Sequence, residues 1–590
     1  MKKLVVTALA ATVSAVVSPS FADNYYFNPG AVDSETPVDL TDLSVWHKDS
    51  KTGAAPASLD TLAASTLRFN ALTNTVTVPE NTVLKASRVE MDSDQKKSPV
   101  RVVCKFPQSS TFLISGNFYG AQSSCLKEFV WQGGTFCAKG KFFHEWSGTA
   151  EFSGAGTVVS NTPFALQHYN LRYAFSDGVL LTGCSLSSGN DSASRNNFIV
   201  VEGPGTVMTN CTMSLSGAPY NCMYLTNGVR AVNCGDVLIG SGTNTIAVAD
   251  SEISVSSFKF TSVGGHLQVG PGSTVRRTLD GNTLFFAGGS GNVADILGPS
   301  TVFSGWNCRM QGSSQTLNVR DGARYTGANM EVGYSVPHCR LNVSGTNTTF
   351  ALSGDFKCGT SDNASDDIAE FSDGATATVG ALHLSGKSSV GSKIVVRDGA
   401  KLTVTNSYQG ASGLVYASAS GGDNGIVVDN GELVFKRDYL RFLSSAHASG
   451  NDYISMAGTN GFLSVQYLNS DGSKVELRFS VPREGKADGR PYVDLWRDNA
   501  SYSVFNGQPG RFGLKVSADE HWARSGRSNC VDLIRAMKIS KNVVSELTAI
   551  MSTVDPATLG GMTLSVVEDD TYAYLRLNAG PRQGMVIILR

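Results

Sequence analysis

The sequence contains few charged residues, and neither sign of charge is in clear excess. Asp, Glu, Lys and Arg make up 17% of the 590 residues, and the formal net charge is -2. A typical soluble domain has about 25% charged residues. Proteins that bind nucleic acid usually show a basic surplus or a basic stripe. The composition therefore argues against nucleic acid as a partner.

Apolar runs long enough to cross a bilayer are absent from the sequence. A spanning helix needs about 20 apolar residues, and the most pronounced run, residues 4–17, is shorter. It follows Lys2 and Lys3 and precedes Ser-Phe-Ala at 20–22. A basic end, an apolar stretch and a small-residue cleavage site form a secretory signal peptide. We expect residues 1–22 to be removed and the mature chain to be exported without a transmembrane segment.

The sequence also lacks the compact motifs of common catalytic sites. Its eight histidines show no metal-ligand spacing such as His-Glu-x-x-His, and there is no Gly-x-Ser-x-Gly elbow or Walker loop. Weak matches to glycine-rich phosphate loops carry no weight in a chain with 62 glycines. No residue is identified as catalytic.

A short alternating phrase recurs along the chain. Residues 394–404 read IVVRDGAKLTV, and related phrases begin at Leu317 (LNVRDGARYTG), Ala369 (AEFSDGATATV) and Ile426 (IVVDNGELVF). Apolar residues alternate on both sides of Asp-Gly or Asn-Gly, and a period of two is typical of strands with one buried face. The dipeptide predicts a turn, because glycine accepts positive φ and the short polar side chain bonds its own backbone.

The glycine of this phrase gives the length of the repeat. Its positions are 21 to 32 residues apart and 25 apart on average, if Ser251, Ser300 and Thr346 mark weaker copies. Without helical periodicity, such a unit matches one coil of a parallel β-helix, whereas a propeller blade needs about 40 to 45 residues. The glycine markers are Gly156, Gly178, Gly205, Gly228, Gly272, Gly322, Gly374, Gly399 and Gly431.

The repeat predicts a mostly β protein in four segments. The signal peptide at 1–22 precedes an N-terminal cap region at 23–74, a parallel β-helix at 75–436 and a smaller α+β domain at 437–590. Such an array needs caps, because each coil buries its apolar residues only against its neighbours.

The last segment differs in its periodicity. Residues 474–481 and 572–577 alternate like strands of an ordinary sheet. Between them we expect a helix from Asn529 through Met537 and a second helix over residues 543–551. This segment would cap the β-helix, dock to an export machine or attach the protein to the cell.

The VRDGA phrase, the glycine-rich coils and the export signal resemble the passenger regions of autotransporter-type surface proteins, which are right-handed parallel β-helices of the pectin-lyase-like class. The resemblance covers roughly residues 75–435. YYFNPG at 25–30, with Trp46 downstream, also resembles the start of autotransporter-associated β-strand proteins. A translocator barrel is not recognisable, since the chain closes on Leu589-Arg590 instead of an aromatic residue. The resemblance implies an extracellular location or the outer surface of a bacterium.

Two functions from different classes follow. The first is a structural, adhesin-like rod that presents a binding surface to glycans or to a cell-surface protein. The alternative is a polysaccharide lyase or glycoside hydrolase, because enzymes of the pectin-lyase-like fold cut acidic polysaccharides. Such an enzyme needs clustered carboxylates, for Ca²⁺ or as an acid/base pair, together with a basic residue.

The densest acidic cluster is SDNASDDIAEFSDG at residues 361–374. Asp362, Asp366 and Asp367 are the candidate ligands of a Ca²⁺ ion, the one cofactor that the sequence suggests. The alternative is that these acids decorate a solvated loop and Asp373 makes the turn.

Eleven cysteines are present, so at least one has no intramolecular disulfide partner. Cys184, Cys211 and Cys234 each follow a marker glycine by six residues, which stacks them in consecutive coils. Coils about 4.8 Å apart place Cα atoms within the roughly 4.4 to 6.8 Å that a disulfide tolerates. The three residues form either one disulfide and a free thiol or a ladder of buried thiols.

Overall fold

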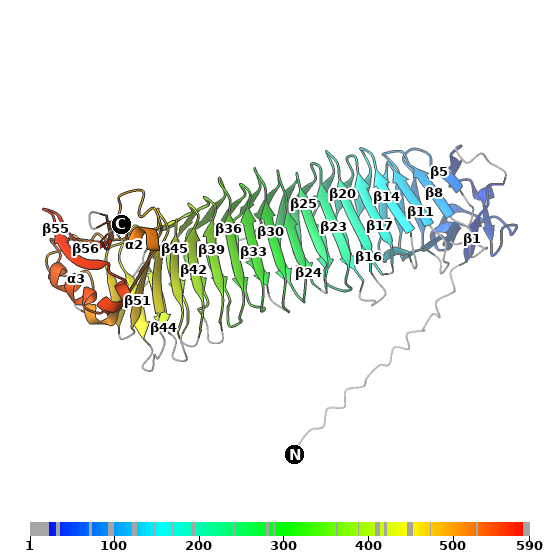
Figure 1. Ribbon diagram of the computed structural model, residues 1–590. Helices are drawn as coiled ribbons and strands as arrows, with labels where there is room; N and C mark the ends of the chain where they lie inside the picture. The colour runs from blue at the N-terminus through cyan, green and yellow to red at the C-terminus, as the bar shows by residue number, and fades with distance from the viewer. Residues whose placement is uncertain are drawn as a thin grey trace, which may run out of the picture.

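Parallel strands stacked along one axis make up most of the protein (Figure 1). The computed structural model describes residues 23–581, except 31–35, 70–72, 92–99, 121–126, 145–147, 168, 190–194, 241, 279–282, 287–288, 361–363, 387–388, 407–412, 418–421, 445–451, 472–473, 507 and 527–528. Strands account for 53% of the chain and helices for 6%. The fold is a parallel β-solenoid with coils about 25 residues apart, as the repeat predicts.

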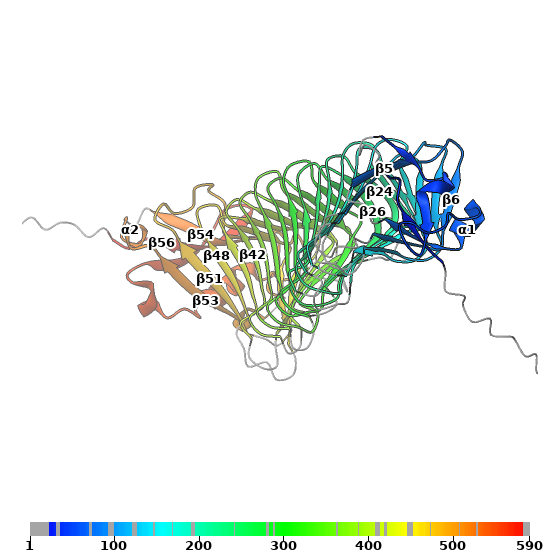
Figure 2. The same cartoon turned by 90° about the vertical axis from the view of Figure 1, so that its right-hand side faces the viewer.

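Each coil contributes strands to three faces, and the coils follow one another as loops around a common axis (Figure 2). In face 1, nineteen strands within the described residues pair in parallel. They are β2 (Val38–Asp39), β5 (Thr73–Thr77), β8 (Val100–Lys105), β11 (Lys127–Gln132), β14 (Gly148–Ser153), β17 (Leu171–Ser176), β20 (Asn197–Glu202), β23 (Asn221–Thr226), β25 (Thr245–Ala249), β27 (His266–Val269), β30 (Val293–Leu297), β33 (Thr316–Arg320), β36 (Arg340–Ser344), β39 (Ile368–Ser372), β42 (Lys393–Arg397), β45 (Gly425–Asp429), β48 (Asp452–Ala457), β51 (Val475–Val481) and β53 (Phe512–Ala518).

Face 2 follows face 1 in each coil. Its strands are β6 (Val83–Ala86), β9 (Thr111–Ile114), β12 (Thr135–Ala138), β15 (Val158–Ser160), β18 (Leu180–Thr182), β21 (Val207–Thr209), β24 (Arg230–Ile239), β26 (Glu252–Phe260), β28 (Thr274–Arg277), β31 (Val302–Ser304), β34 (Arg324–Gly327), β37 (Thr349–Leu352), β40 (Thr376–Val379), β43 (Lys401–Val404), β46 (Glu432–Phe435), β49 (Phe462–Val465), β52 (Val493–Leu495) and β54 (Cys530–Met537).

Face 3 completes the coil, and the long strands β24 and β26 continue from face 2 into it. Its other strands are β1 (Asn24–Phe27), β4 (Thr66–Phe69), β7 (Arg88–Met91), β10 (Phe118–Gly120), β13 (Phe142–His144), β16 (Pro163–Leu166), β19 (Ser185–Ser188), β22 (Thr212–Leu215), β29 (Thr283–Phe286), β32 (Asn307–Met310), β35 (Met330–Val332), β38 (Asp355–Cys358), β41 (Ala381–Leu384), β44 (Gly413–Ala417), β47 (Leu440–Ser444) and β50 (Leu468–Asp471).

The Asp-Gly phrase makes the turn between face 1 and face 2. Asp398 and Gly399 have φ of 51° and 79° and join β42 to β43. Asp321 and Gly322 occupy the same place between β33 and β34, with φ of 60° and 87°. Two successive residues with positive φ favour this dipeptide, because glycine pays no steric cost there and aspartate tolerates the conformation. The predicted turn is confirmed.

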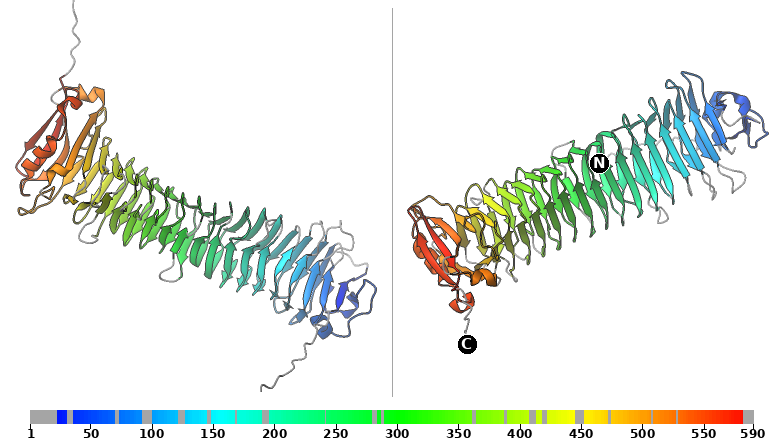
Figure 3. Two further views of the ribbon diagram at one scale, coloured as in Figure 1. Left: turned by 90° about the horizontal axis from the view of Figure 1, so that it is seen from below. Right: turned by 45° about the horizontal axis from the view of Figure 1, so that its top comes forward.

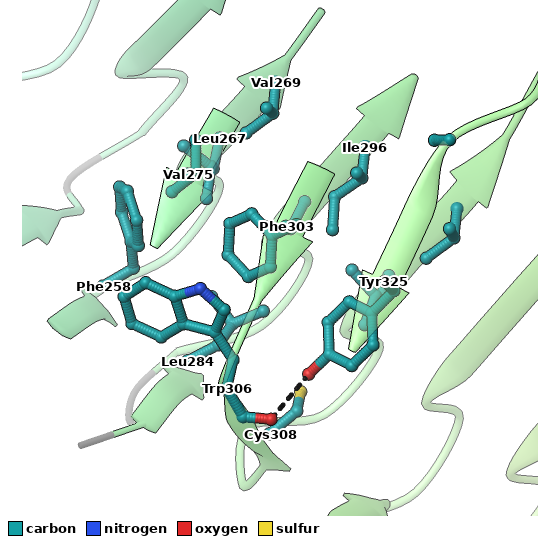
Figure 4. Packing of buried hydrophobic residues seen from close by; sticks show 14 of the residues in the cluster. Phe258, Leu267, Val269, Val275, Leu284, Ile296, Phe303, Trp306, Cys308 and Tyr325 are labelled. Carbon is teal, nitrogen blue, oxygen red and sulfur yellow. Dashed lines mark hydrogen bonds between the residues drawn. The ribbon is translucent and has the colours of Figure 1, made fainter. Parts of the chain in front are cut away.

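The core contains the large apolar side chains that alternate inward. Trp306 packs against Phe303 and Phe258, and the Tyr325 hydroxyl donates to the Trp306 carbonyl oxygen at 3.2 Å (Figure 4). Trp131 is also fully buried. Both tryptophans therefore fill the interior and offer no exposed face to a ligand.

The parallel stack extends beyond both boundaries expected for the β-helix. At the start, β1 already pairs in parallel with β4, and β2 with β5. Beyond residue 436, face 1 continues through β48 and β51 to β53. Residues 474–481 therefore lie in the solenoid and not in a separate sheet.

Of the two helices expected near the C-terminus, the second is confirmed and the first is wrong. Helix α3 (Val543–Met551) buries Val543, Leu547 and Ile550. Residues 530–537 form strand β54, which pairs in parallel with β52 and antiparallel with β56 (Tyr572–Asn578). Burial along β54 alternates on either side of a register shift between Asp532 and Ile534, and pairing with the last coil outweighs the helix-capping signal of Asn529.

Antiparallel strands lie at both ends of the stack (Figure 3). At the N-terminal end, β3 (Trp46–Lys48) pairs with β1. At the C-terminal end, β55 (Thr563–Glu568) pairs antiparallel with β56, and α3 packs against β53, β55 and β56. The other short elements are α1 (Leu59–Ala63), α2 (Glu520–Ala523), η1 (Leu43–Val45), η2 (Pro509–Arg511) and η3 (Pro556–Leu559).

No helix in the described ranges has the length and apolar character needed to cross a membrane.

Candidate ligand-binding cleft

The candidate Ca²⁺ ligands are not gathered around one point. Asp362 lies outside the described residues. The Asp366 side chain is 59% exposed and its Oδ2 is 3.8 Å from His338 Nδ1, whereas Asp367 is fully buried. Among the described residues, no group of three or more His, Cys, Asp or Glu side chains could hold a metal ion.

Asp367 instead belongs to an inner ladder of polar side chains at the corner between face 3 and face 1, here called the corner ladder. Its Oδ1 accepts a hydrogen bond from the Cys339 backbone N–H of the preceding coil at 2.7 Å. The same contact, at 2.7 to 3.3 Å, is made by Asn197 with Leu171, Asn244 with Asn221, Asn292 with Gly265, Asn424 with Ser392 and Asp452 with Asn424.

Asp367 and Asp452 differ from the asparagines of the corner ladder in one atom. The Oδ2 of each is buried and has no hydrogen-bond partner, whereas Asn244 Nδ2 donates to backbone carbonyl oxygens. Burial raises the pKa of Asp367 to about 8 and that of Asp452 to about 7. Asp367 therefore keeps its proton near neutral pH and Asp452 titrates there, and their hydrogen bonds to the preceding coil make both part of the corner ladder.

The three stacked cysteines lie at the corner between face 2 and face 3. Cys184, Cys211 and Cys234 are all buried free thiols. Thr212 N–H donates to the Cys184 carbonyl oxygen at 2.9 Å, and Gly235 N–H to that of Cys211 at 2.8 Å, so the three lie in consecutive coils. Contact with the Cys211 thiol and burial raise the pKa of Cys184 and Cys234, which disfavours their reactive thiolate forms.

A cleft of about 390 Å³ opens on the outside of face 3. Strands β32, β35 and β38 of three consecutive coils form it. Their outward side chains align in register, with Arg309 opposite Glu331 and Glu331 opposite Lys357. The lining residues are Asn307, Cys308, Arg309, Asn329, Glu331, Asp355 and Lys357.

The charged side chains of the cleft form one connected network. Arg309 Nε lies 2.5 Å from Glu331 Oε2. Lys357 Nζ is 3.7 Å from both Glu331 Oε1 and Asp355 Oδ2. The exposed fractions of the Glu331 and Asp355 side chains are 17% and 24%, so both carboxylates are substantially shielded from solvent.

Two asparagines form the side of the cleft beside this network. Asn307 Oδ1 accepts from the Asn329 backbone N–H at 3.0 Å, and Asn329 Oδ1 accepts from that of Asp355 at 2.8 Å. These contacts fix both amide planes. The Nδ2 groups make no hydrogen bond to any residue that the structure describes, which leaves their donors for a ligand.

An aromatic ring and a histidine adjoin the charged network. The Arg309 guanidinium lies over the Tyr334 ring, 4.5 Å from its centre. His383 Nε2 is 4.0 Å from Asp355 Oδ2, and burial lowers the pKa of His383 to about 4. His383 is therefore neutral at physiological pH and adds no charge to the cleft.

The sequence reasoning missed the cleft because coil lengths vary. Arg309 and Glu331 lie nine residues after the markers Ser300 and Gly322, but Lys357 lies eleven after Thr346. A fixed offset from the turn therefore does not align the three side chains. A usable signal was the set of short segments NCRM, NMEV and DFKC, each with a charged third residue.

Comparison of the chain with protein-family models and with curated proteins yields no match in either.

Proposed function

We propose that this protein is exported and acts outside the cell, or on the outer surface of a bacterium, as a structural, adhesin-like rod. Its cleft on face 3 would bind a glycan or a surface protein. The observation that carries the proposal is the cleft itself, because three coils converge there with paired charges, oriented amides and an aromatic neighbour. Specific sites combine a concave surface with a few placed polar groups. The signal-peptide pattern at residues 1–22 supports export.

The autotransporter-like and pectin-lyase-like resemblance fits this role, since the solenoid supplies a long surface on which neighbouring coils hold side chains in register. A rigid sheet also lowers the ordering cost of binding. Partners in this proposal are glycans or cell-surface proteins, without nucleic acid.

The alternative is a polysaccharide lyase or glycoside hydrolase, and one observation favours it. Glu331, Asp355 and Lys357 bring two carboxylates and an amine into one cleft, which are the groups such chemistry requires. Both carboxylates already contact Lys357, however, and the oriented amides of Asn307 and Asn329 are groups that serve binding and not bond cleavage. Binding without cleavage is therefore the better-supported function.

The test uses mature protein, residues 23–590, and a panel of polysaccharides and isolated bacterial surface proteins, with binding and new reducing ends measured in the same wells. Binding should fall at least tenfold in Lys357→Ala, on the order expected for a central contact. Arg276→Ala removes an exposed arginine of face 2 and should leave binding unchanged.

Equal binding by both variants would exclude the cleft as the binding site. New reducing ends that disappear in Asp355→Asn would instead establish the enzyme.

A further inference from the structure

We propose that the cleft on face 3 selects an uncharged glycan, lying along the rod axis across β32, β35 and β38. This inference rests on the proposed function and specifies its ligand. It runs against the acidic polysaccharide suggested by the sequence, and the charges of the cleft are the reason.

The formal charges lining the cleft cancel. Arg309 and Lys357 carry two positive charges, and Glu331 and Asp355 carry two negative ones. His383, at the end of the network, is neutral. A uronate chain would therefore meet no net positive potential, and a polyamine would meet no net negative one.

The charges are also already paired with one another. Glu331 contacts both Arg309 and Lys357 through different oxygens, at 2.5 and 3.7 Å. A ligand carboxylate could take a cation only by displacing Glu331, which would leave that partly shielded carboxylate without its partners. A carboxylate left without its partners weakens the binding of an acidic ligand, and penalties of this kind are a common source of specificity.

The hydrogen-bonding groups of the cleft that remain available to a ligand are suited to binding hydroxyl groups. The Asn307 and Asn329 amides are fixed through their oxygens and have spare N–H donors. Paired carboxylates retain further acceptor positions, since each can take about four hydrogen bonds. Sugar hydroxyls both donate and accept, so they can use both kinds of group without disturbing the ion pairs.

The geometry of the solenoid fits a chain of repeating rings. Arg309, Glu331 and Lys357 follow one another in register on coils about 4.8 Å apart. This spacing is comparable with the length that one pyranose adds to an extended glycan. The Arg309 guanidinium lies over the Tyr334 ring, 4.5 Å from its centre, which holds it at one end of the row.

The decisive variant is Glu331→Gln, which keeps the size of the side chain and gives the cleft a net positive charge. Wild-type and variant proteins are titrated with neutral glucans and mannans and with polygalacturonate and alginate, at low and high salt. Wild-type protein should bind a neutral polymer with a Kd that changes less than about twofold between 50 and 500 mM salt, because no net charge is screened.

In Glu331→Gln, binding to the uronate polymers should strengthen by about tenfold and become salt-sensitive, because Arg309 and Lys357 lose their shared acceptor. Glu370→Gln is the matched control. Glu370 accepts from Arg397 at 2.7 Å on face 1, so it has a similar ion pair away from the cleft. This control should bind like wild type, and thermal melts of both variants verify their folding.

The possible outcomes test the identity of the ligand and the proposed function separately. Tighter wild-type binding to uronates, lost in Lys357→Ala, would overturn the neutral-glycan inference and keep the cleft as a binding site. Failure of Glu331→Gln to gain uronate binding, while folded, would also overturn it. If cleft variants alter binding to no member of the panel, the glycan inference fails, and surface-protein binding in the preceding test decides whether the proposed function survives.

Discussion

Replacing Asp367 by Asn should stabilise the protein, and the gain should depend on pH. Asp367 occupies an asparagine position in the corner ladder, where its Oδ1 accepts from Cys339 N–H and its Oδ2 has no partner. Asparagine keeps the accepting oxygen and replaces Oδ2 by a donor. It also removes the need to take up a proton on folding.

The magnitude follows from the pKa of Asp367, which burial raises to about 8. Its unfolded value is about 3.9. The free energy of unfolding of the wild type therefore falls, relative to that of the variant, as pH rises from about 4 to about 8. Above pH 8 the difference between the two free energies is constant. One pKa unit corresponds to about 1.4 kcal/mol, which gives at most about 1.5 kcal/mol at pH 5 and about 4 kcal/mol at pH 7.

The assay is thermal unfolding of the mature protein at pH 5 and at pH 7, for wild type and Asp367→Asn. Per-residue unfolding entropies predict a shift in Tm of about 3 °C at pH 7 if the rod unfolds as one unit, and about 1 °C at pH 5. Asp321→Asn is the control, because Asp321 is an exposed aspartate that does not contribute to the raised pKa of Asp367. It should change Tm by less than about 0.5 °C at either pH.

The reasoning would be refuted by a Tm difference that is the same at pH 5 and pH 7, since Asp367 would then not bind a proton on folding. A lower Tm for Asp367→Asn would refute it as well, because the carboxyl would then make a contact that an amide cannot replace.

Three further predictions concern other parts of the solenoid. Asp452→Asn should also stabilise the protein. The gain should level off near pH 7 instead of pH 8, because the pKa of Asp452 is raised to about 7. Thermal melts from pH 4 to 9 measure this gain, and a gain that does not change with pH would contradict the prediction. Gly399→Ala should cost about 1 to 2 kcal/mol in denaturant unfolding, since Gly399 has φ of 79°. Gly513→Ala, with open space around its Cβ and no positive φ, should cost less, and equal costs would contradict the turn argument. Cys530 is exposed and should react with a maleimide before buried Cys184, as peptide mapping of brief labelling would show. The reverse order would contradict the assigned burial.

The repeat and its turn could be predicted because both are local. An alternating run defines a strand within a few residues, and Asp398-Gly399 carries the φ preference of the turn in two adjacent positions. The length of a coil then follows from the distance between turns. Helix α3 was also readable, since Val543, Leu547 and Ile550 share one face without help from distant residues.

The remaining features depend on contacts between distant residues. Residues 530–537 become a strand because β52 and β56 lie on either side of them. The sequence around Asn529 does not reveal these pairing partners. The acidic cluster near Asp367 looked solvated, although coil geometry turns that one carboxyl inward and its neighbour Asp366 outward. Because the loops differ in length, the sequence spacing likewise did not reveal that Arg309, Glu331 and Lys357 align across three neighbouring coils.

The corner ladder gives the rod a direction of assembly. In every contact described above, the backbone N–H belongs to one coil and the accepting side chain to the next, as with Asn221 N–H and Asn244 Oδ1. Each of these six contacts therefore leaves one buried donor on a coil until the following stretch of chain is in place. A solenoid that grows from its N-terminal end thus has each of these donors in place before the side chain that accepts from it. Growth of the stack from its N-terminal end would satisfy these donors in order, up to the last of them, the Asn424 N–H that Asp452 accepts.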